Sequence, residues 1–262
     1  MSIQEPYIPR EYLALQINYC KQQLAALPEV RIVQRKLQGI TRMMYVSGSH
    51  VYTPESPNGK TMKEIYQLRE NYLCELSRLE GLWNSTYRRT PPADIMPRKN
   101  TRKLYVSEDE FVILDSNYFI SLKNDANPFY PEHKTHYFNG IYYRSPAEAD
   151  IARFYTEQKI PFKYEPEIWI KGINHPIYSD FVVLFEELNQ CKFHEHFGLK
   201  NSSDYTRKTA TTYINYSGAG LLPGIDVFYT YDLNDVPFDL RVLHTQINSV
   251  VYNSLFMIDN CS

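Results

Sequence analysis

The chain has 262 residues, of which 43% are hydrophobic and 22% charged, and its formal net charge is −2. This length allows one large domain or two modest ones. The near-neutral charge excludes a global field that attracts polyanions, so any nucleic-acid contact has to come from a local patch.

Sorting signals and cysteine usage point to the cytoplasm. The first residues, MSIQEPYIPREY, have neither the basic region nor the apolar region of a signal peptide. No run approaches the ~18 apolar residues of a membrane span, so we expect no membrane partner. The four cysteines are widely scattered and form no C-x-x-C pair, which favours free thiols in a reducing compartment.

Residues 1–87 are expected to form a mostly helical arm around a small β element. Apolar residues recur at helical spacing within 10–27 and within 61–86. Residues 30–53 are rich in β-branched side chains and have turn signals at Gln38-Gly39 and Ser47-Gly48, which predicts a hairpin or meander. Such an arm is typical of packing or partner contact rather than of catalysis.

Residues 88–104 are expected to form a basic linker. Within 88–103 the segment has three prolines and six basic residues against one acid, Asp94. A solvated linker is the favoured interpretation, and a segment that contacts phosphate is the alternative.

Residues 105–262 are expected to form an α/β domain. The patterns predict elements in the order α-β-β-β-α-β-α. These are a helix at 146–158, strands at 162–171, 178–186 and 191–197, a helix at about 203–216, a strand at 225–231 and a helix at about 239–257.

The stretch KFHEHFG, which contains Glu195, belongs to the third of these strands. If the second and third strands form a hairpin with its tip near Leu188, Asp180 lies opposite Glu195 or His196. Opposed carboxylates among aromatic side chains repel each other unless a cation lies between them. A hard cation such as Mg²⁺ would resolve this repulsion. If the register differs by one residue, the two acids face opposite sides and are surface charges.

Two further motifs near this hairpin have competing interpretations. Ser145 and Glu148 form an S-x-x-E capping box at the start of a helix, which explains Glu148 by itself. The same helix could direct Glu148 toward the hairpin acids. His194 and His196 share one face of a regular strand, but a zinc site would lack a third ligand at recognisable spacing.

The ordered set of these features resembles the PD-(D/E)XK nuclease superfamily over roughly residues 136–257. More narrowly, it is similar to a bacterial group with R-S-x-x-E, Y-P-D-F and E-H-x-G motifs. The resemblance implies a restriction-endonuclease-like core with a mixed central sheet flanked by helices. The segments that carry it are RSPAEADIARFY, IPFKYEP, IYSDF, HEHFG, DYTRK and PGIDVFYTYD.

By that resemblance Asp180 and Glu195 would hold Mg²⁺, or Mn²⁺ in its place. The backbone carbonyl of His196 would be a further ligand, and Glu148 would hold the metal or its water. The implied reaction is hydrolysis of phosphodiester bonds by a metal-activated water, with nucleic acid, and DNA in particular, as the expected substrate.

The chain departs from the motif at its lysine. The lysine position of the motif is Phe197 here, and the proline before Asp180 is Ser179. Lys208, on the following helix, is the first candidate to replace the lysine, and the His196 side chain is the second. Lys192 is expected to face the other side of its strand.

Two other functions remain open at this point. If no cation reaches the acids, the chain would be an inactive nuclease-like module that binds nucleic acid or protein. The third alternative is a partner-binding protein whose arm makes the contact. Metal affinity separates the nuclease from both, and binding without cleavage separates the second from the third.

Overall fold

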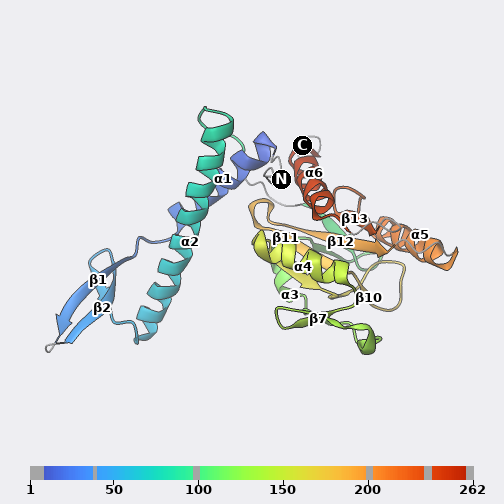
Figure 1. The fold of residues 1–262 in the computed structure, drawn as a ribbon, viewed down its shortest axis with the longest axis horizontal. Coiled ribbons are helices and arrows are strands. Elements are labelled where there is room, and N and C mark those ends of the chain that lie inside the picture. Colours follow the sequence, from blue (N-terminus) through green and yellow to red (C-terminus); the bar gives the residue numbers. More distant parts are fainter. Residues whose placement is uncertain (1–8, 38–39, 97–100, 199–202, 233–237, 258–262) are drawn as a thin grey trace. The chain divides into compact units, whose positions relative to one another are not determined.

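The structure, a computed structural model, describes residues 9–37, 40–96, 101–198, 203–232 and 238–257 (Figure 1). The chain divides into two compact units, one of residues 10–96 and one that includes residues 97–262. The division falls inside the segment that the sequence predicts as a linker. Among the described residues, no helix combines the length and the apolar character that crossing a membrane requires.

Two helices and a three-stranded meander form the first unit. The helices are α1 (Arg10–Ala26) and α2 (Pro57–Thr86), and the strands, in sheet order, are β1 (Arg31–Leu37), β2 (Ile40–Ser47) and β3 (His50–Tyr52). Helix α2 begins before the predicted residue 61 because Ser56 caps it, with the N–H of Gly59 donating to the Ser56 hydroxyl at 3.0 Å. The predicted turn at Gln38-Gly39 lies outside the described residues.

Residues 88–96 pack against these helices. The amide of Asn18 in α1 donates to the carbonyls of Pro92 and Ile95, each at 2.8 Å, and the Trp83 indole donates to the carbonyl of Arg89. These bonds satisfy the buried amide of Asn18 and fix the course of a proline-containing segment.

A mixed four-stranded sheet in the order β13-β12-β11-β8 is the centre of the second unit. Strands β8 (Phe162–Tyr164), β11 (Phe181–Phe185) and β12 (Gln190–Gly198) are antiparallel neighbours, and β13 (Val227–Asp232) runs parallel to β12. Helix α5 (Ser203–Gly218) connects the two parallel strands. The predicted α/β class is therefore confirmed.

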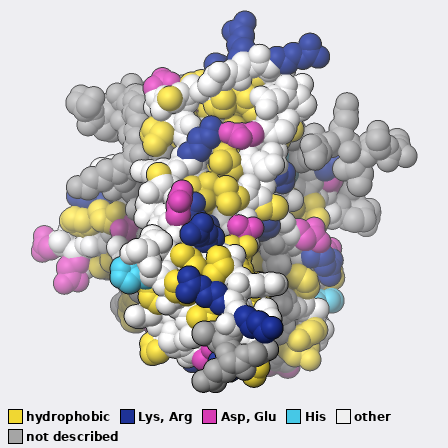
Figure 2. All heavy atoms as spheres, turned by 90° about the vertical axis from the view of Figure 1, so that its left-hand side faces the viewer, with side chains coloured by type: hydrophobic (Ala, Val, Ile, Leu, Met, Phe, Trp, Pro, Cys, Tyr) yellow, Lys and Arg dark blue, Asp and Glu magenta, His cyan; other side chains and the backbone are white. Residues whose placement is uncertain are grey.

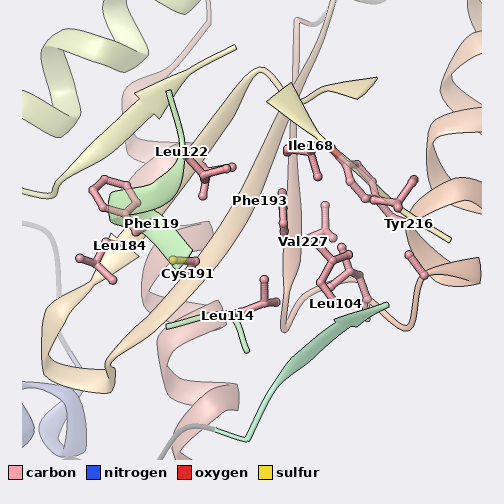
Figure 3. Close-up of a cluster of buried hydrophobic side chains, with 14 of the residues drawn as sticks. Leu104, Leu114, Phe119, Leu122, Ile168, Leu184, Cys191, Phe193, Tyr216 and Val227 are labelled. Atoms are coloured by element: carbon pink, nitrogen blue, oxygen red, sulfur yellow. The ribbon is translucent and has the colours of Figure 1, made fainter. Parts of the chain in front are cut away.

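A cluster of buried hydrophobic side chains lies on the sheet face that carries Val182, Phe193 and Val227 (Figure 3). Tyr216 from α5 and Phe119 from α3 (Ser116–Ser121) contribute to the same cluster. On the other face, the helices α4 (Pro146–Glu157) and α6 (Leu240–Met257) contact the sheet through side chains described below.

Several short elements had no counterpart in the sequence analysis. They have few residues and little periodicity, so that hydropathy patterns do not reveal them. They are β4 (Lys103–Tyr105), β5 (Phe111–Ile113), α3, a 3₁₀ turn (Pro131–His133), β6 (His136–Phe138) and β7 (Ile141–Tyr143).

Two predicted strands are shorter than expected. The strand predicted at 162–171 is interrupted at Glu165, where φ is +40°, and Pro166 follows, so that only Glu167–Ile168 resumes as β9. The strand predicted at 178–186 is interrupted at Ser179 and Asp180, which separate β10 (Ile177–Tyr178) from β11. The two breaks meet, because the N–H of Glu165 donates to the carbonyl of Asp180 at 3.1 Å.

Candidate active site

The hairpin of β11 and β12 brings Asp180 and Glu195 to the same place in the sheet. Phe181 pairs with His194 and Val182 with Phe193. Extending this register by one residue places Asp180, which precedes β11, opposite Glu195. Residues in register share a face of the sheet. The predicted register is thus correct to within one residue, and Glu195 is one of the two partners that the sequence proposed.

The carboxylate of Asp180 reaches across to β12. The N–H of His196 donates to Asp180 Oδ2 at 2.7 Å. Burial raises the pKa of Asp180 well above its usual value, and the charges of Glu195, Glu148 and Glu165 raise it further, against the lowering effect of the His196 N–H. Three other carboxylates therefore converge on Asp180.

Glu195 is 7% exposed and is held by a tyrosine from α5. The hydroxyl of Tyr216 donates to Glu195 Oε1. Burial and the charge of Glu195 raise the pKa of Tyr216, so its hydroxyl keeps its proton and remains a donor. Tyr216 therefore belongs to the hydrophobic cluster and also contacts the candidate site.

Glu148 lies in the first turn of α4, where Ser145 caps the helix as predicted. The N–H of Glu148 donates to the Ser145 hydroxyl at 3.1 Å, but Glu148 Oε2 accepts from the N–H of Arg144 at 3.1 Å and from the Tyr164 hydroxyl at 2.7 Å. Burial raises the pKa of Glu148 despite these bonds. Both earlier interpretations of Glu148 are therefore compatible with the structure, which gives it a capping role and a place near Asp180.

Glu165 is a buried acid that the sequence analysis did not single out. Its side chain forms ion pairs with Arg144 at 2.9 Å and Lys134 at 2.8 Å, and it accepts from the Asn127 amide at 2.9 Å. Lys134 also pairs with Asp125. The one sequence signal for this position was Pro166, which argues against an uninterrupted strand there.

His194 and His196 lie on the opposite face of β12 from Glu195. His194 Nδ1 is 2.7 Å from the Tyr155 hydroxyl, and its Nε2 is 2.8 Å from Thr230 Oγ1. His196 Nδ1 is 2.8 Å from the same Thr230 oxygen. Both nitrogens of His194 are thus used within the protein, which argues against the zinc alternative. Burial lowers the pKa of His194 and so favours its neutral form.

The structure places the three candidates to replace the motif lysine differently with respect to Asp180 and Glu195. Lys192 is fully buried on the histidine face of β12, where it donates to Gln190 and to Ser254 of α6, each at 2.7 Å, and therefore faces away from Glu195 as predicted. Lys208 lies in α5, but its side chain is outside the described part of the structure. The side chain of His196 faces Thr230 and Asp232 rather than the acids.

Asp180 and Glu195 offer carboxylate oxygens, which are the type of ligand that a hard divalent cation prefers. Among the residues that the structure describes, no group of three or more His, Cys, Asp or Glu side chains is arranged so that it could hold a metal ion. Mg²⁺, however, keeps several waters and is commonly bound through one or two carboxylates. Asp180 and Glu195 supply two, and their mutual repulsion is the kind that a cation relieves.

Comparisons of the chain with protein-family models, with curated proteins and with solved structures found no match.

Proposed function

We propose that the chain is a divalent-metal-dependent nuclease that hydrolyses phosphodiester bonds, with DNA as its substrate, on a restriction-endonuclease-like core. The observation that carries this proposal is the convergence of Asp180 and Glu195 on neighbouring strands, with Glu148 and Glu165 close enough to raise the pKa of Asp180. Additional support comes from the element order, in which α4 precedes three antiparallel strands and α5 leads to a parallel fourth.

In this proposal the protein orients its acids through fixed donors. The His196 N–H holds Asp180, the Tyr216 hydroxyl holds Glu195, and the Tyr164 hydroxyl holds Glu148. Asp180 and Glu195 would be the ligands of Mg²⁺ or Mn²⁺. The bound ion would lower the pKa of a water and polarise the scissile phosphate.

Glu148 and the cations around Glu165 would complete the site. Because burial raises its pKa, Glu148 is suited to exchange a proton with a water at the phosphate. Arg144 and Lys134 lie near Glu148 through Glu165 and Tyr164, so they join Lys208 as candidates for the charge that Phe197 cannot supply.

The test is cleavage of labelled single-stranded and double-stranded DNA and RNA with Mg²⁺ or Mn²⁺. We expect EDTA to abolish cleavage, and Asp180→Asn or Glu195→Gln to lower its rate at least about 100-fold, because a metal contributes several kcal/mol to such a barrier. Asp239→Asn is the matched control, since Asp239 is an acid paired with the exposed Arg241. Absence of cleavage of every substrate, with no metal binding by calorimetry, would refute the proposal.

One observation favours the inactive nuclease-like module as a second candidate. Phe197, at the lysine position of the motif, is 6% exposed and stacks on Tyr229 within the hydrophobic cluster. That position thus contributes to the core and offers no charge. Binding of nucleic acid without cleavage, in protein that does not bind the metal, would select this candidate.

A further inference from the structure

The hairpin of β1 and β2 in the first unit concentrates positive charge. Arg31, Arg35, Lys36 and Arg42 are all exposed there, and residues 31–47 contain no Asp or Glu. The face drawn in Figure 2 has Lys and Arg side chains among hydrophobic ones, with Asp and Glu side chains between them. Ile40 and Met43, on the same hairpin, are 58% and 48% exposed.

Two of these arginines are placed directly against each other. Arg35 pairs with Arg42 in the antiparallel register, so both side chains leave the same face of the hairpin. Like charges in register destabilise a hairpin. Arg31, four residues before Arg35, shares this face, whereas Lys36 lies on the other.

Several basic residues elsewhere in the same unit have partners inside the protein. Lys21 pairs with Glu80, and Arg78 pairs with Glu75. Arg69 donates to two carbonyls at the end of α1. The hairpin cations form no ion pair within the described residues, so their charge is available to an external anion.

We propose that the β1–β2 hairpin binds the phosphate backbone of duplex DNA. A two-stranded ribbon fits the major groove of B-form DNA, which is about 12 Å wide. The major groove of A-form RNA is deep and narrow, so a ribbon reaches it poorly. Cations on both faces of the ribbon can contact the phosphates on both sides of the groove.

The basic segment at 101–103 is a weaker candidate for this contact. Arg102 forms an ion pair with the fully buried Asp226, and the Lys103 ammonium lies 3.9 Å from the centre of the Phe111 ring. These two cations are engaged within the second unit, in contrast to those of the hairpin.

The test is the salt dependence of binding to a fluorescent DNA duplex of about two helical turns, measured in EDTA so that no cleavage occurs. Each phosphate contact contributes about 0.9 to the slope of log K against log salt, so Arg35→Gln/Arg42→Gln should lower the slope by about 1.8. Between about 50 and 200 mM salt the wild-type protein should lose roughly tenfold more affinity than this variant. Arg78→Gln/Arg241→Gln removes the same charge from paired sites and should leave the slope nearly unchanged.

A charge reversal separates binding from folding. Arg42→Glu creates an attractive pair with Arg35, so the melting temperature should stay the same or rise while DNA affinity falls. A melting temperature that falls with the affinity would overturn the proposal. Unchanged DNA binding with increased aggregation would also overturn it, and would assign the charges to protection of an exposed strand edge.

The substrate and the nuclease proposal are tested separately. An RNA duplex of the same length should bind more weakly, and equal or tighter hairpin-dependent binding of RNA would overturn the assignment to DNA. Because binding is measured without metal, hairpin-dependent DNA binding in a protein that never cleaves would uphold this inference and refute the nuclease. Hairpin variants that still cleave DNA and bind it as the wild type does would uphold the nuclease proposal and refute the hairpin inference.

Discussion

The two faces of strand β12 both contain buried polar side chains, but these side chains have different kinds of partner on each face. On one face Lys192 and His194 bond to neutral groups, among them Ser254 and Thr230. His196 on the same face contacts Thr230 and the partly exposed carboxylate of Asp232. On the other face Glu195 lies opposite Asp180. The charges of Glu195, Glu148 and Glu165 raise the pKa of Asp180.

This difference teaches that burial of a polar residue does not by itself indicate function. The histidine face resembles an internal network in which donors and acceptors match one another, which is a way to stabilise a specific fold. The acidic face contains like charges whose repulsion is relieved only by a proton or a cation. The second pattern is therefore the better indication of a site for an external ligand.

The largest expected effect is a loss of stability from His194→Ala. This change opens a cavity between Phe181 and Phe228 and leaves the Tyr155 and Thr230 hydroxyls without their shared partner, at a cost of about 3 kcal/mol in the free energy of unfolding. Urea denaturation measures it. His175→Ala, in an exposed turn, should change the value by less than about 0.5 kcal/mol. A variant that kept its stability but lost metal binding would place the metal on the histidine face.

The second effect is an opposite pH dependence of the two faces in metal-free protein. The folded pKa of Asp180 lies above its usual 3.8, so its contribution to stability is present below that value and is lost as pH rises through the folded pKa. The folded pKa of His194 lies below its usual 6.5, so its contribution is present above 6.5 and is lost as pH falls through the folded pKa.

Asp180→Asn isolates the acidic half of this prediction. In EDTA, the free energy of unfolding of the variant minus that of the wild type should increase between about pH 4 and pH 8, because only the wild type has to ionise the buried carboxyl. Asp239→Asn should give a nearly constant difference over this range, since Arg241 lowers the pKa of Asp239 and its contribution is lost only below about pH 4. A difference for Asp180→Asn that does not vary with pH would contradict the convergence of charges at that position.

The smallest expected effect is that of Lys192→Met. Burial lowers the pKa of Lys192 to about 8, so removing its charge relieves a desolvation cost that roughly offsets the bonds lost to Gln190 and Ser254. We expect a change of less than about 1 kcal/mol in stability and an unchanged cleavage rate. Lys208→Met should instead slow cleavage if Lys208 replaces the motif lysine. Loss of cleavage in Lys192→Met would show that the two faces do not act separately.

Local patterns in the sequence predicted the parts of the site that lie on continuous elements. Strand alternation and the position of the tip were sufficient to place Asp180 opposite Glu195 to within one residue, and the S-x-x-E spacing identified the cap at Ser145. These features depend on neighbours in the chain or on one hairpin, where register follows from simple geometry.

The parts that the sequence did not reveal depend on contacts between distant segments. Glu165 is satisfied by Lys134 and Arg144, which precede it by 31 and 21 residues and come from separate loops and turns. Tyr216 meets Glu195 because α5 packs on the sheet, and helical spacing predicts only that Tyr216 faces the core. Neither periodicity nor motif spacing encodes such pairings.

The single hydroxyl of Thr230 has a consequence for the two histidines that contact it. A hydroxyl carries one hydrogen and can donate it to only one ring, so at least one imidazole must present its own N–H to Thr230. The tautomer of either ring therefore restricts that of the other. Tyr155, His194, Thr230 and His196 form a continuous hydrogen-bonded wire, which ends 3.4 Å from the partly exposed carboxylate of Asp232. Protonation of His196, at the outer end, would therefore change the hydrogen-bond directions as far as Tyr155, at the buried end, without movement of any side chain.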